Sequence, residues 1–448
     1  MESIDLKRRR LAALLAAGAA GAAIPLRAAF AANAKAGGQK RVVVLTSYTE
    51  EFTSRFVKGF EAAHPGSRVE IAWRQSADAL AYLRRGGTAE VDVIWTPAPR
   101  NFATLKEAGK LAKLTFIDHA ALPGKVGGEA ISDPDGFYAA FELAGYGIAY
   151  NPEAVRQLGL PAPRDWRDLA DPGYRGKVEL PIPGRVGFAP VAIESVLQGY
   201  GWTEGWATLA GIAANTEFGR GDRTSEADAV LMGNKAARLT IDFFTAPSRR
   251  NANPAKGELA FVYPPKTAFN PSHVAITAQA PHPDMARAFV EFVLSKPAQE
   301  MLLGDDVRRL PVRRDIYAEH PELSARPFDS GTLAYDDVTR RARQGLVATL
   351  FDVTLVQPHA ELVALWEALA RAEKKGVSAN TREARALLSA TPVDEAAQRD
   401  DKLRALFAFA ELAPGKPEPK PGEERLAVEK RWKADVAARI AKARQLLA

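Results

Sequence analysis

The sequence predicts an α/β fold built on a mainly parallel sheet, because short apolar strands alternate with amphipathic helices through its first third. Arg41–Leu45 is a β-branched run of the kind found in buried strands. A helical pattern follows at once and places Phe52, Phe56 and Phe60 on one face. The alternation then continues through a strand, a helix, a strand and a helix at Arg68–Trp73, Asp78–Arg85, Val91–Trp95 and Asn101–Ala108.

The middle of the chain has longer strands and a different rhythm. Phe137–Tyr150 is typical of one long strand and contains Gly145 and Gly147. Glu258–Tyr263 is a later strand that can carry the chain back towards the first domain. Further strands are expected at Lys177–Leu180, Arg238–Phe243 and His273–Thr277. An amphipathic helix is expected at Pro283–Leu303.

Beyond Leu310-Pro311-Val312 the chain becomes helical and charged. Ala413–Gly422 is a Pro-rich spacer of extended character. One final basic helix is expected at Glu423–Ala448. Between Val312 and the spacer, the helix candidates are Glu361–Lys374, Arg382–Leu388 and Ala396–Leu412.

The N-terminal segment has the layout of an export signal. A basic stretch ending in Lys7-Arg8-Arg9-Arg10 precedes the uncharged run Leu11–Ile24, and Ala29-Phe30-Ala31 supplies small residues around a cleavable bond. The paired arginines resemble a twin-arginine signal, which exports folded proteins. The alternatives are an N-terminal helix of a cytosolic protein or a retained anchor.

Composition excludes several classes of protein. The predicted signal carries five basic residues against two acidic ones, so its removal lowers the formal net charge from +6 to +3. The remaining charge gives no argument for nucleic-acid binding. The chain has no cysteine, which excludes disulfides, thiolate nucleophiles, Cys-ligated zinc and iron–sulfur clusters. Its length indicates two or three domains after processing.

A set of short segments occurs in order between about Arg41 and Arg314. They are Val44–Tyr48, Val91–Trp95, Asp165–Leu169, Gly176–Val178, Pro181–Gly187, Thr240–Phe243, Phe261–Thr267, Ala286–Leu303 and Leu310–Val312. In this order they resemble the iron(III)- and phosphonate-type periplasmic binding proteins of ABC importers, and most closely the relatives for 2-aminoethylphosphonate or phosphoglycerate uptake. Each segment alone is weakly specific, and the order carries the resemblance.

The resemblance implies a two-lobed α/β fold, the type II periplasmic-binding-protein fold with crossing hinge strands, followed by a helical C-terminal extension. After a signal peptide at 1–31, we expect lobe 1 at residues 40–140 and 264–330 and lobe 2 at 141–263. The remaining segments are the extension at 331–412, the Pro-rich linker at 413–422 and the terminal helix at 423–448.

Candidate ligand-binding residues follow the first strands. In such a fold the ligand lies beyond the carboxyl ends of the strands, against helix N-termini. Thr46, Ser47 and Tyr48 lie where a strand passes into its helix, so their hydroxyls and the N–H groups there can bind an anion. The alternative, that Ser47 or Thr49 only caps its own helix, is compatible with this one. Trp95 can form an apolar wall, although core packing is the more natural role.

Further candidates lie later in the chain. Arg185, in a Pro/Gly-rich loop, can bind a phosphonate or carboxylate through paired hydrogen bonds; the alternative is a solvated arginine. Thr224 and Ser225 precede a helical stretch, which they can cap while also facing the cleft. Asp242 can orient Arg185 or accept from a ligand amine, and Tyr263 can donate from the hinge.

Ferric iron is the alternative ligand. Relatives that bind it directly use two adjacent tyrosines in the second lobe. This chain has no Tyr-Tyr pair, and Tyr263 is followed by Pro264, so the oxygen-rich site is incomplete. We therefore expect a small organic anion, namely a phosphonate, phosphate ester or carboxylate, and we expect neither a metal nor another cofactor.

The leading hypothesis is a monomeric periplasmic receptor that captures this anion by lobe closure. It would deliver the anion to an ABC permease in the inner membrane, with no role in nucleic-acid binding. A second hypothesis is a ligand sensor that signals to a membrane partner through the extension. A periplasmic enzyme is disfavoured, because the chain has no cysteine and no recognisable catalytic triad. We expect no catalytic residues.

Overall fold

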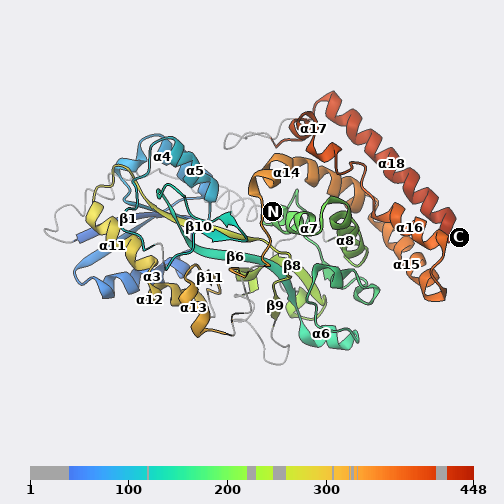
Figure 1. The fold of residues 1–448 in the computed structure, drawn as a ribbon, viewed down its shortest axis with the longest axis horizontal. Helices are drawn as coiled ribbons and strands as arrows, with labels where there is room; N and C mark the ends of the chain where they lie inside the picture. Colours follow the sequence, from blue (N-terminus) through green and yellow to red (C-terminus); the bar gives the residue numbers. More distant parts are fainter. Residues whose placement is uncertain are drawn as a thin grey trace, which may run out of the picture.

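The computed structural model describes residues 40–118, 121–218, 229–245, 259–304, 307–321, 323, 327–329, 331–409 and 421–448. The predicted signal peptide, the candidates Thr224 and Ser225, and most of the predicted Pro-rich linker lie outside the described residues. Figure 1 shows two α/β lobes joined by long strands, with a helical extension packed against one of them.

Lobe 1 is built on a sheet with the order β2-β1-β3-β10-β6. Strand β1 pairs in parallel with β2 and β3, while β10 runs antiparallel to β3 and β6. The predicted α/β class is confirmed by this arrangement. The strands are β1 (Lys40–Thr46), β2 (Ser67–Trp73), β3 (Val93–Thr96), β6 (Ala139–Tyr150) and β10 (Phe269–Ile276).

Alternate residues of β1 face two different cores. Val42 and Val44 belong to one core, and Val43 and Leu45 belong to the other, as the two-residue period of a strand requires. The first core is covered by α3 (Glu50–Ala63) and α11 (Pro283–Val293), and the second by α4 (Ser76–Arg84) and α5 (Pro99–Glu107). The parallel strands therefore deliver their carboxyl ends to one edge of lobe 1.

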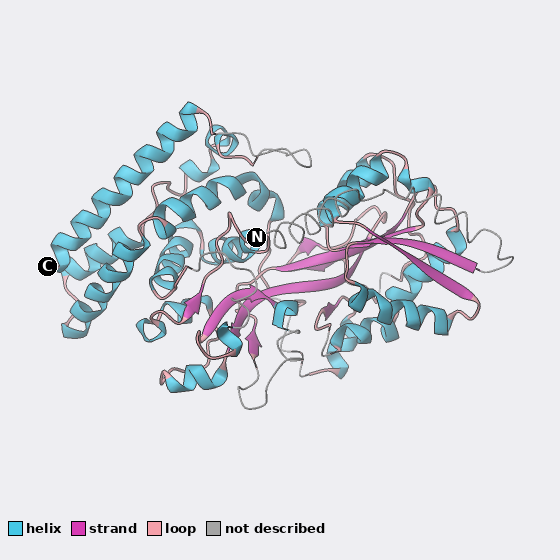
Figure 2. Cartoon of the chain, turned by 180° about the vertical axis from the view of Figure 1, so that it is seen from behind, coloured by secondary structure: helices cyan, strands magenta, loops and turns pink. Residues whose placement is uncertain are grey.

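Strand β6 belongs to both lobes. Its first half pairs with β10 and with β11 (Leu310–Pro311), and its second half pairs with β8 (Ala237–Ile241) and β9 (Ala260–Val262). The strands cross the molecule from one lobe to the other in Figure 2. A Cβ at Gly145 would lie 2.3 Å from the Tyr263 ring, so the crossing strands pack too closely for a side chain there.

Lobe 2 and the extension share one hydrophobic core, which contains residues of both. In the terminal helix, Val428, Trp432, Val436 and Ile440 repeat every fourth residue and are buried. The helices that build this unit are α6 (Pro152–Gln157), α7 (Ala189–Tyr200), α8 (Trp202–Ala214), α14 (Asp337–Phe351), α15 (His359–Lys375), α16 (Ala379–Ser389), α17 (Asp401–Leu406) and α18 (Glu423–Leu447). The extension is thus packed scaffold along most of its described length.

Shorter elements connect these helices and strands. A π-helical turn at Asp352–Val356 follows α14, and a 3-10 turn, η4, at Asp242–Thr245 follows β8. The remaining short elements used below are β4 (Lys125–Val126), β5 (Glu129–Ala130), β7 (Val178–Glu179), α12 (Lys296–Glu300) and α13 (Arg314–Glu319).

The prediction of a single helix at Ala396–Leu412 is wrong. The chain instead forms a 3-10 turn at Ala397–Arg399 and then the separate helix α17. The break falls at Asp400, whose backbone is extended and whose side chain accepts a hydrogen bond from the Leu403 N–H at 2.8 Å. An aspartate in this position begins a new helix rather than continuing the old one.

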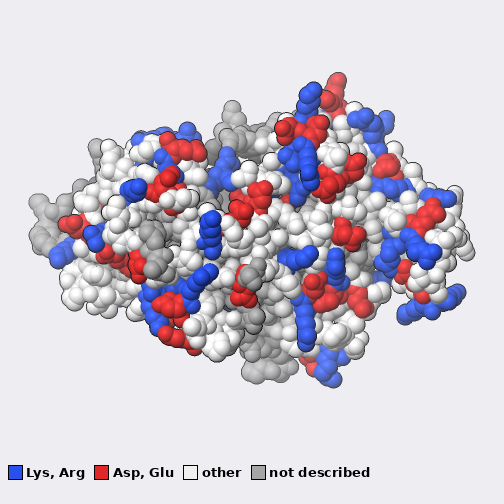
Figure 3. All heavy atoms as spheres, viewed as in Figure 1, with Lys and Arg blue, Asp and Glu red and all other residues white. Residues whose placement is uncertain are grey.

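Charged side chains are mixed over the surface. On the face drawn in Figure 3, described basic and acidic groups alternate across both lobes and the extension. No single helix in the described part of the chain is long and apolar enough to span a membrane. The bent pair Asp337–Val356 and His359–Lys375, whose axes differ by 63°, passes the test together on length and composition.

A buried ion pair fastens the extension to lobe 2. The Arg343 guanidinium on α14 donates to Glu194 on α7 with Nε–Oε1 at 2.9 Å, and also to Gln398 at 2.7 Å. Both charged side chains are nearly inaccessible, at 6% and 1% exposed. Removing one partner from such a pair leaves a buried charge without compensation.

We therefore expect Arg343→Met to lower the free energy of unfolding by about 3 kcal/mol, and the double variant Glu194→Leu/Arg343→Met to recover most of that loss. Urea denaturation measures both. The control is Arg371→Met, which removes the exposed pair with Glu367 and should cost at most about 1 kcal/mol. Equal losses of unfolding free energy in Arg343→Met and Arg371→Met would contradict a stabilising role for the buried ion pair.

Candidate ligand-binding site

The carboxyl end of β1 lies at the edge of lobe 1 that faces lobe 2. The Thr46 hydroxyl accepts a hydrogen bond from the Tyr48 N–H at 3.1 Å, and the Ser47 hydroxyl accepts from the Ser76 hydroxyl at 3.3 Å. Thr49 is the N-cap of α3, but its side chain forms no capping bond. The turn is therefore held by Thr46 and Tyr48, and the alternative of simple side-chain capping at α3 is not what the structure shows.

Tyr48 joins the turn to the crossing strand. Its hydroxyl donates to Glu142 Oε1 on β6 at 2.7 Å, and its ring stacks on Phe52 at 4.3 Å. Trp95 meets the Tyr48 ring edge-on at 5.1 Å and is fully buried. Trp95 therefore packs the core of lobe 1 and offers no surface to a ligand, which corrects the apolar-wall interpretation.

Arg309, just before β11, is the buried cation of this region, and the sequence interpretation missed it. Its Nη1 donates to Glu142 Oε1 at 2.5 Å, and the guanidinium lies 4.1 Å from the centre of the Phe243 ring. The Ser272 hydroxyl donates to the same Glu142 oxygen at 2.9 Å. The side chain of Arg309 is only 11% exposed. The one sequence signal was its place beside the Leu310-Pro311 strand.

Asp242 closes the junction from lobe 2, at the end of β8. Its carboxylate accepts from the Gly145 N–H at 2.7 Å and from the Tyr263 hydroxyl at 3.0 Å, both on Oδ2. The Phe243 N–H donates to Oδ1 at 2.7 Å. Tyr263 therefore donates to Asp242 within the hinge, where the sequence interpretation had it donating to a ligand.

Burial sets the electrostatics of the junction. It raises the pKa of Asp242 to about 7, although the hydrogen bonds from Gly145 and Tyr263 and the charge of Arg309 oppose the shift. Burial also raises the pKa of Glu142, against the charge of Arg309 and the Tyr48 hydrogen bond. For Arg309, burial acts to lower the pKa, but the neighbouring Glu142 carboxylate outweighs it and the pKa is raised. The guanidinium stays charged.

Arg185 lies away from this group. Its side chain is 54% exposed, and its guanidinium is 3.6 Å from the Asp352 carboxylate in the extension. Asp242 is bound by Gly145, Phe243 and Tyr263, so the expected pairing of Asp242 with Arg185 is not found.

We call Tyr48, Glu142, Asp242, Phe243 and Arg309 the hinge cluster. Tyr48 and Arg309 come from lobe 1, Asp242 and Phe243 come from lobe 2, and Glu142 lies on the strand that joins the lobes. A cation stacked on a ring keeps the edges of its guanidinium for hydrogen bonds. Such an arrangement can recognise a carboxylate or phosphate group. Within the described ranges, no three His, Cys, Asp or Glu residues converge on a metal position.

Two lobes joined by crossing strands, with charged and aromatic groups gathered at the junction, are an arrangement that can close on a small solute. The chain belongs to the family of bacterial extracellular solute-binding proteins, whose model matches residues 91–330. The predicted resemblance to periplasmic solute-binding proteins of ABC importers is confirmed. Membership places the protein in the periplasm, as a receptor for a small ligand that works with an ABC permease.

Two curated relatives match most of the chain. The phosphoglycerate transport regulatory protein PgtC of Salmonella typhimurium is 30% identical over 381 residues, covering 83% of this chain and 91% of its own length. Iron uptake protein A1 of Synechocystis is 27% identical over 312 residues, covering 67% of this chain and 83% of its own length.

Two solved structures are also similar. The periplasmic binding protein AfuA of Actinobacillus pleuropneumoniae, solved with fructose-6-phosphate, has 20% identity and a TM-score of 0.48, covering 62% of this chain and 86% of its own. The Trichodesmium protein IdiA (FutA), solved with iron and citrate, has 19% identity and a TM-score of 0.48, covering 61% of this chain and 87% of its own.

Stability should fall as pH rises between the two pKa values of Asp242. The folded carboxyl keeps its proton up to about pH 7, while the unfolded one loses it near 4, so the folded state binds more protons in that window. We expect Asp242→Asn to abolish this loss, so that its melting temperature rises relative to the wild type from pH 5 to pH 7.5. Parallel pH profiles for the two proteins would contradict this.

Proposed function

We propose that the protein captures a small organic anion, a phosphate ester, phosphonate or carboxylate, between its lobes and delivers it to an ABC permease. The observation that carries the proposal is Arg309, an almost buried guanidinium stacked on Phe243 where the lobes meet. The 30% identity to a phosphoglycerate transport regulatory protein across most of both chains supports the same ligand class.

Closure follows from how the hinge cluster is divided between the lobes. Arg309 of lobe 1 and Phe243 of lobe 2 lie against each other in this structure. An anion bound beside them contacts both lobes, and opening of the lobes would break its contacts with one of them. Its affinity is therefore higher for the closed state, and this difference shifts the equilibrium towards closure.

Ferric iron is the second candidate, because iron uptake protein A1 is a relative. Hard ferric iron requires oxygen ligands. The turn η4 instead presents the adjacent rings of Phe243 and Phe244, with centroids 4.7 Å apart, and these rings have no oxygen. A cation at Arg309 also disfavours a bare trivalent metal. Both arguments favour an organic anion.

We also propose that the protein is exported by the twin-arginine route and acts as a monomer. The paired arginines at Arg8-Arg9 support the export route. The shared core of lobe 2 and the extension favours export of a folded protein, because α18 must be in place before that core is complete. Binding and transport require no catalytic group, so we propose a receptor and not an enzyme.

Ligand class is tested by titrating the purified mature protein with 3-phosphoglycerate, 2-aminoethylphosphonate, malate and ferric citrate. We expect at least one of the first three anions to raise the melting temperature in proportion to the logarithm of its concentration. A rise with ferric citrate alone would instead assign an iron receptor. If none of the four compounds raises the melting temperature, the proposal that the protein is a receptor for small anions is overturned.

The hinge cluster is tested with the double variant Glu142→Gln/Arg309→Gln, which removes both buried charges together and leaves no lone charge behind. We expect the anion found above to bind at least tenfold more weakly, or about 1.4 kcal/mol. Arg185→Gln is the matched control at an exposed arginine, and its affinity should stay within about threefold of wild type. The reverse pattern would move the anion site to Arg185.

A sensor role is the remaining candidate, favoured by the word "regulatory" in the name of the relative PgtC. Exposed basic side chains on α18 are the available surface, at Lys430, Arg431 and Lys433. We expect charge reversal at all three positions to leave ligand uptake by cells unchanged, because the opposite face of α18 holds the packing contacts. Selective loss of ligand-dependent gene induction, with uptake intact, would assign a signalling surface.

A further inference from the structure

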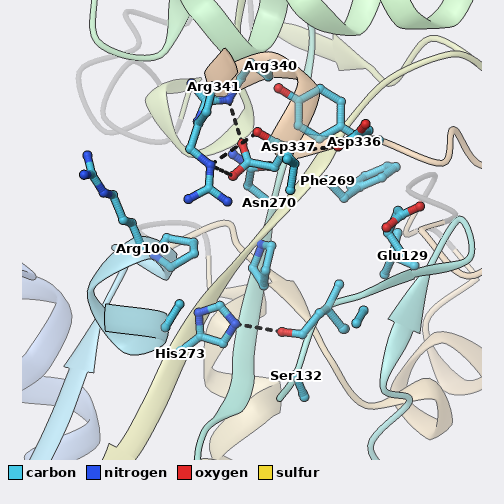
Figure 4. Close-up of a pocket in the computed structure, with 18 of the residues that line it drawn as sticks. Arg100, Glu129, Ser132, Phe269, Asn270, His273, Asp336, Asp337, Arg340 and Arg341 are labelled. Atoms are coloured by element: carbon cyan, nitrogen blue, oxygen red, sulfur yellow. Dashed lines mark hydrogen bonds and ion pairs between the residues drawn. The ribbon is translucent and has the colours of Figure 1, made fainter. Parts of the chain in front are cut away.

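A pocket of about 500 Å³ lies between lobe 1 and the beginning of the extension. Figure 4 shows Arg100, Ser132 and His273 on the lobe 1 side and Arg340 and Arg341 on the side of α14. Its volume is in the range of small-molecule sites. The members of the hinge cluster are absent from its lining among the described residues, so the pocket is distinct from the hinge cluster.

The two sites lie on opposite faces of the crossing strands. Ser272 on β10 bonds to Glu142 in the hinge cluster. The next residue, His273, lies against Phe102 of α5 at 5.2 Å and against Tyr138 at 5.0 Å. Tyr48 packs in the core covered by α3, and Phe102 packs in the core covered by α5. The hinge cluster therefore faces the α3 side, and His273 in the pocket faces the α5 side.

Two polar atoms of pocket-lining residues are buried without a partner in the described part of the chain. They are the Tyr335 hydroxyl and His273 Nδ1. His273 Nε2 lies 2.7 Å from the Ile131 carbonyl oxygen, so Nε2 donates and Nδ1 is left as an acceptor. Burial lowers the pKa of His273 to about 4, and the ring is neutral at pH 7. Such groups are costly unless something binds them.

Charge is distributed unevenly around the pocket. Of the described side chains, three arginines and three acidic residues line it. Asp337 accepts ion pairs from Arg340 at 2.6 Å and from Arg341 at 3.0 Å, so one carboxylate is shared by two guanidiniums. Arg100 and Arg341 extend towards the same end of the pocket in Figure 4, while Asp336 and Glu129 lie towards the other end. Positive charge is therefore concentrated at the Arg341 end, which suits a carboxylate.

We propose that this pocket is a second ligand site for small carboxylates that also carry a hydroxyl or amine, and that its occupation favours lobe closure. The carboxylate would bind at the Arg341 end. The hydroxyl or amine would donate to His273 Nδ1, and the Tyr335 hydroxyl would donate to a ligand oxygen. This goes beyond capture at the hinge cluster and does not depend on it.

Coupling to closure follows from the anchoring of the two walls. The start of α14 is fixed to lobe 2, because Gln198 on α7 donates to the Asp336 carbonyl at 2.9 Å and accepts from its N–H at 2.8 Å. The other wall, with His273 and the β4–β5 hairpin, belongs to lobe 1. A ligand that touches both walls binds the closed state more tightly and raises its population.

The test is calorimetric titration of the full mature protein with D-glycerate and L-serine, with propionate as a control that lacks the donor group. We expect D-glycerate or L-serine to bind, and propionate to bind at least tenfold more weakly. Tyr335→Phe should weaken that binding at least tenfold, yet leave the melting temperature of the unliganded protein unchanged or raised, since it removes an unpartnered hydroxyl. Arg341→Gln should weaken binding as well.

The double variant Glu142→Gln/Arg309→Gln distinguishes binding at the pocket from binding at the hinge cluster. We expect D-glycerate or L-serine still to bind to this variant. Closure is read from fluorescence transfer between dyes on cysteines introduced at the exposed Lys58 and Lys433, because the chain has no other cysteine. The proposal of a second site would be overturned if neither probe binds. It would also be overturned if binding survives both pocket variants, or if binding is lost only in the hinge-cluster double variant. Binding without a change in transfer would overturn the coupling.

Discussion

Strand β6 must satisfy two sheets at once, and the architecture of the molecule depends on that constraint. It pairs with β10 and β11 in lobe 1 and with β8 and β9 in lobe 2. Every residue from Ala139 to Ala149 is buried, so its polar groups must find partners within the protein. Glu142 and the Gly145 N–H therefore draw Tyr48, Arg309 and Asp242 to the point where the lobes meet. The hinge cluster is a consequence of the crossing.

The sequence predicted the fold well where local patterns decide it. The β-branched run at Arg41–Leu45 and the phenylalanines of α3 became the first strand and helix as expected. The long strand at Phe137–Tyr150 became β6, shortened by two residues. The helix expected at Ala396–Leu412 failed because Asp400 caps a new helix there, which a period of apolar residues does not reveal.

Site residues were harder to predict than elements. Tyr48 and Asp242 were proposed from their positions at strand ends, which a sequence shows directly. Arg309 was missed because its importance arises from Glu142, far away in sequence, and from the ring of Phe243. Trp95 was proposed from its position, but a large ring within a buried strand is usually needed for packing, as it is here. Long-range pairing is the part that a single sequence conceals.

Asp242 and His273 show how burial acts differently on the two kinds of group. It raises the pKa of the carboxyl and lowers that of the imidazole, because in each case the neutral form is favoured away from water. Both groups therefore tend to be uncharged, whereas the pKa values of Arg309 and Arg340 are raised and their guanidiniums stay charged. Neutral hydrogen-bonding groups thus lie beside ion-paired arginines on both faces of the crossing strands.

The common core of lobe 2 and the extension has a consequence for the order of folding. Ile148 and Val155 lie in the same buried cluster as Trp432 and Ile440, so contacts across much of the chain must form before that core is complete. Contacts between residues distant in sequence slow folding, because a long loop must be closed first. The core of lobe 1 also requires β10 and α11, but these elements are synthesised before α18. Lobe 1 should therefore gain native protection from hydrogen exchange first, with lobe 2 following once α18 has docked.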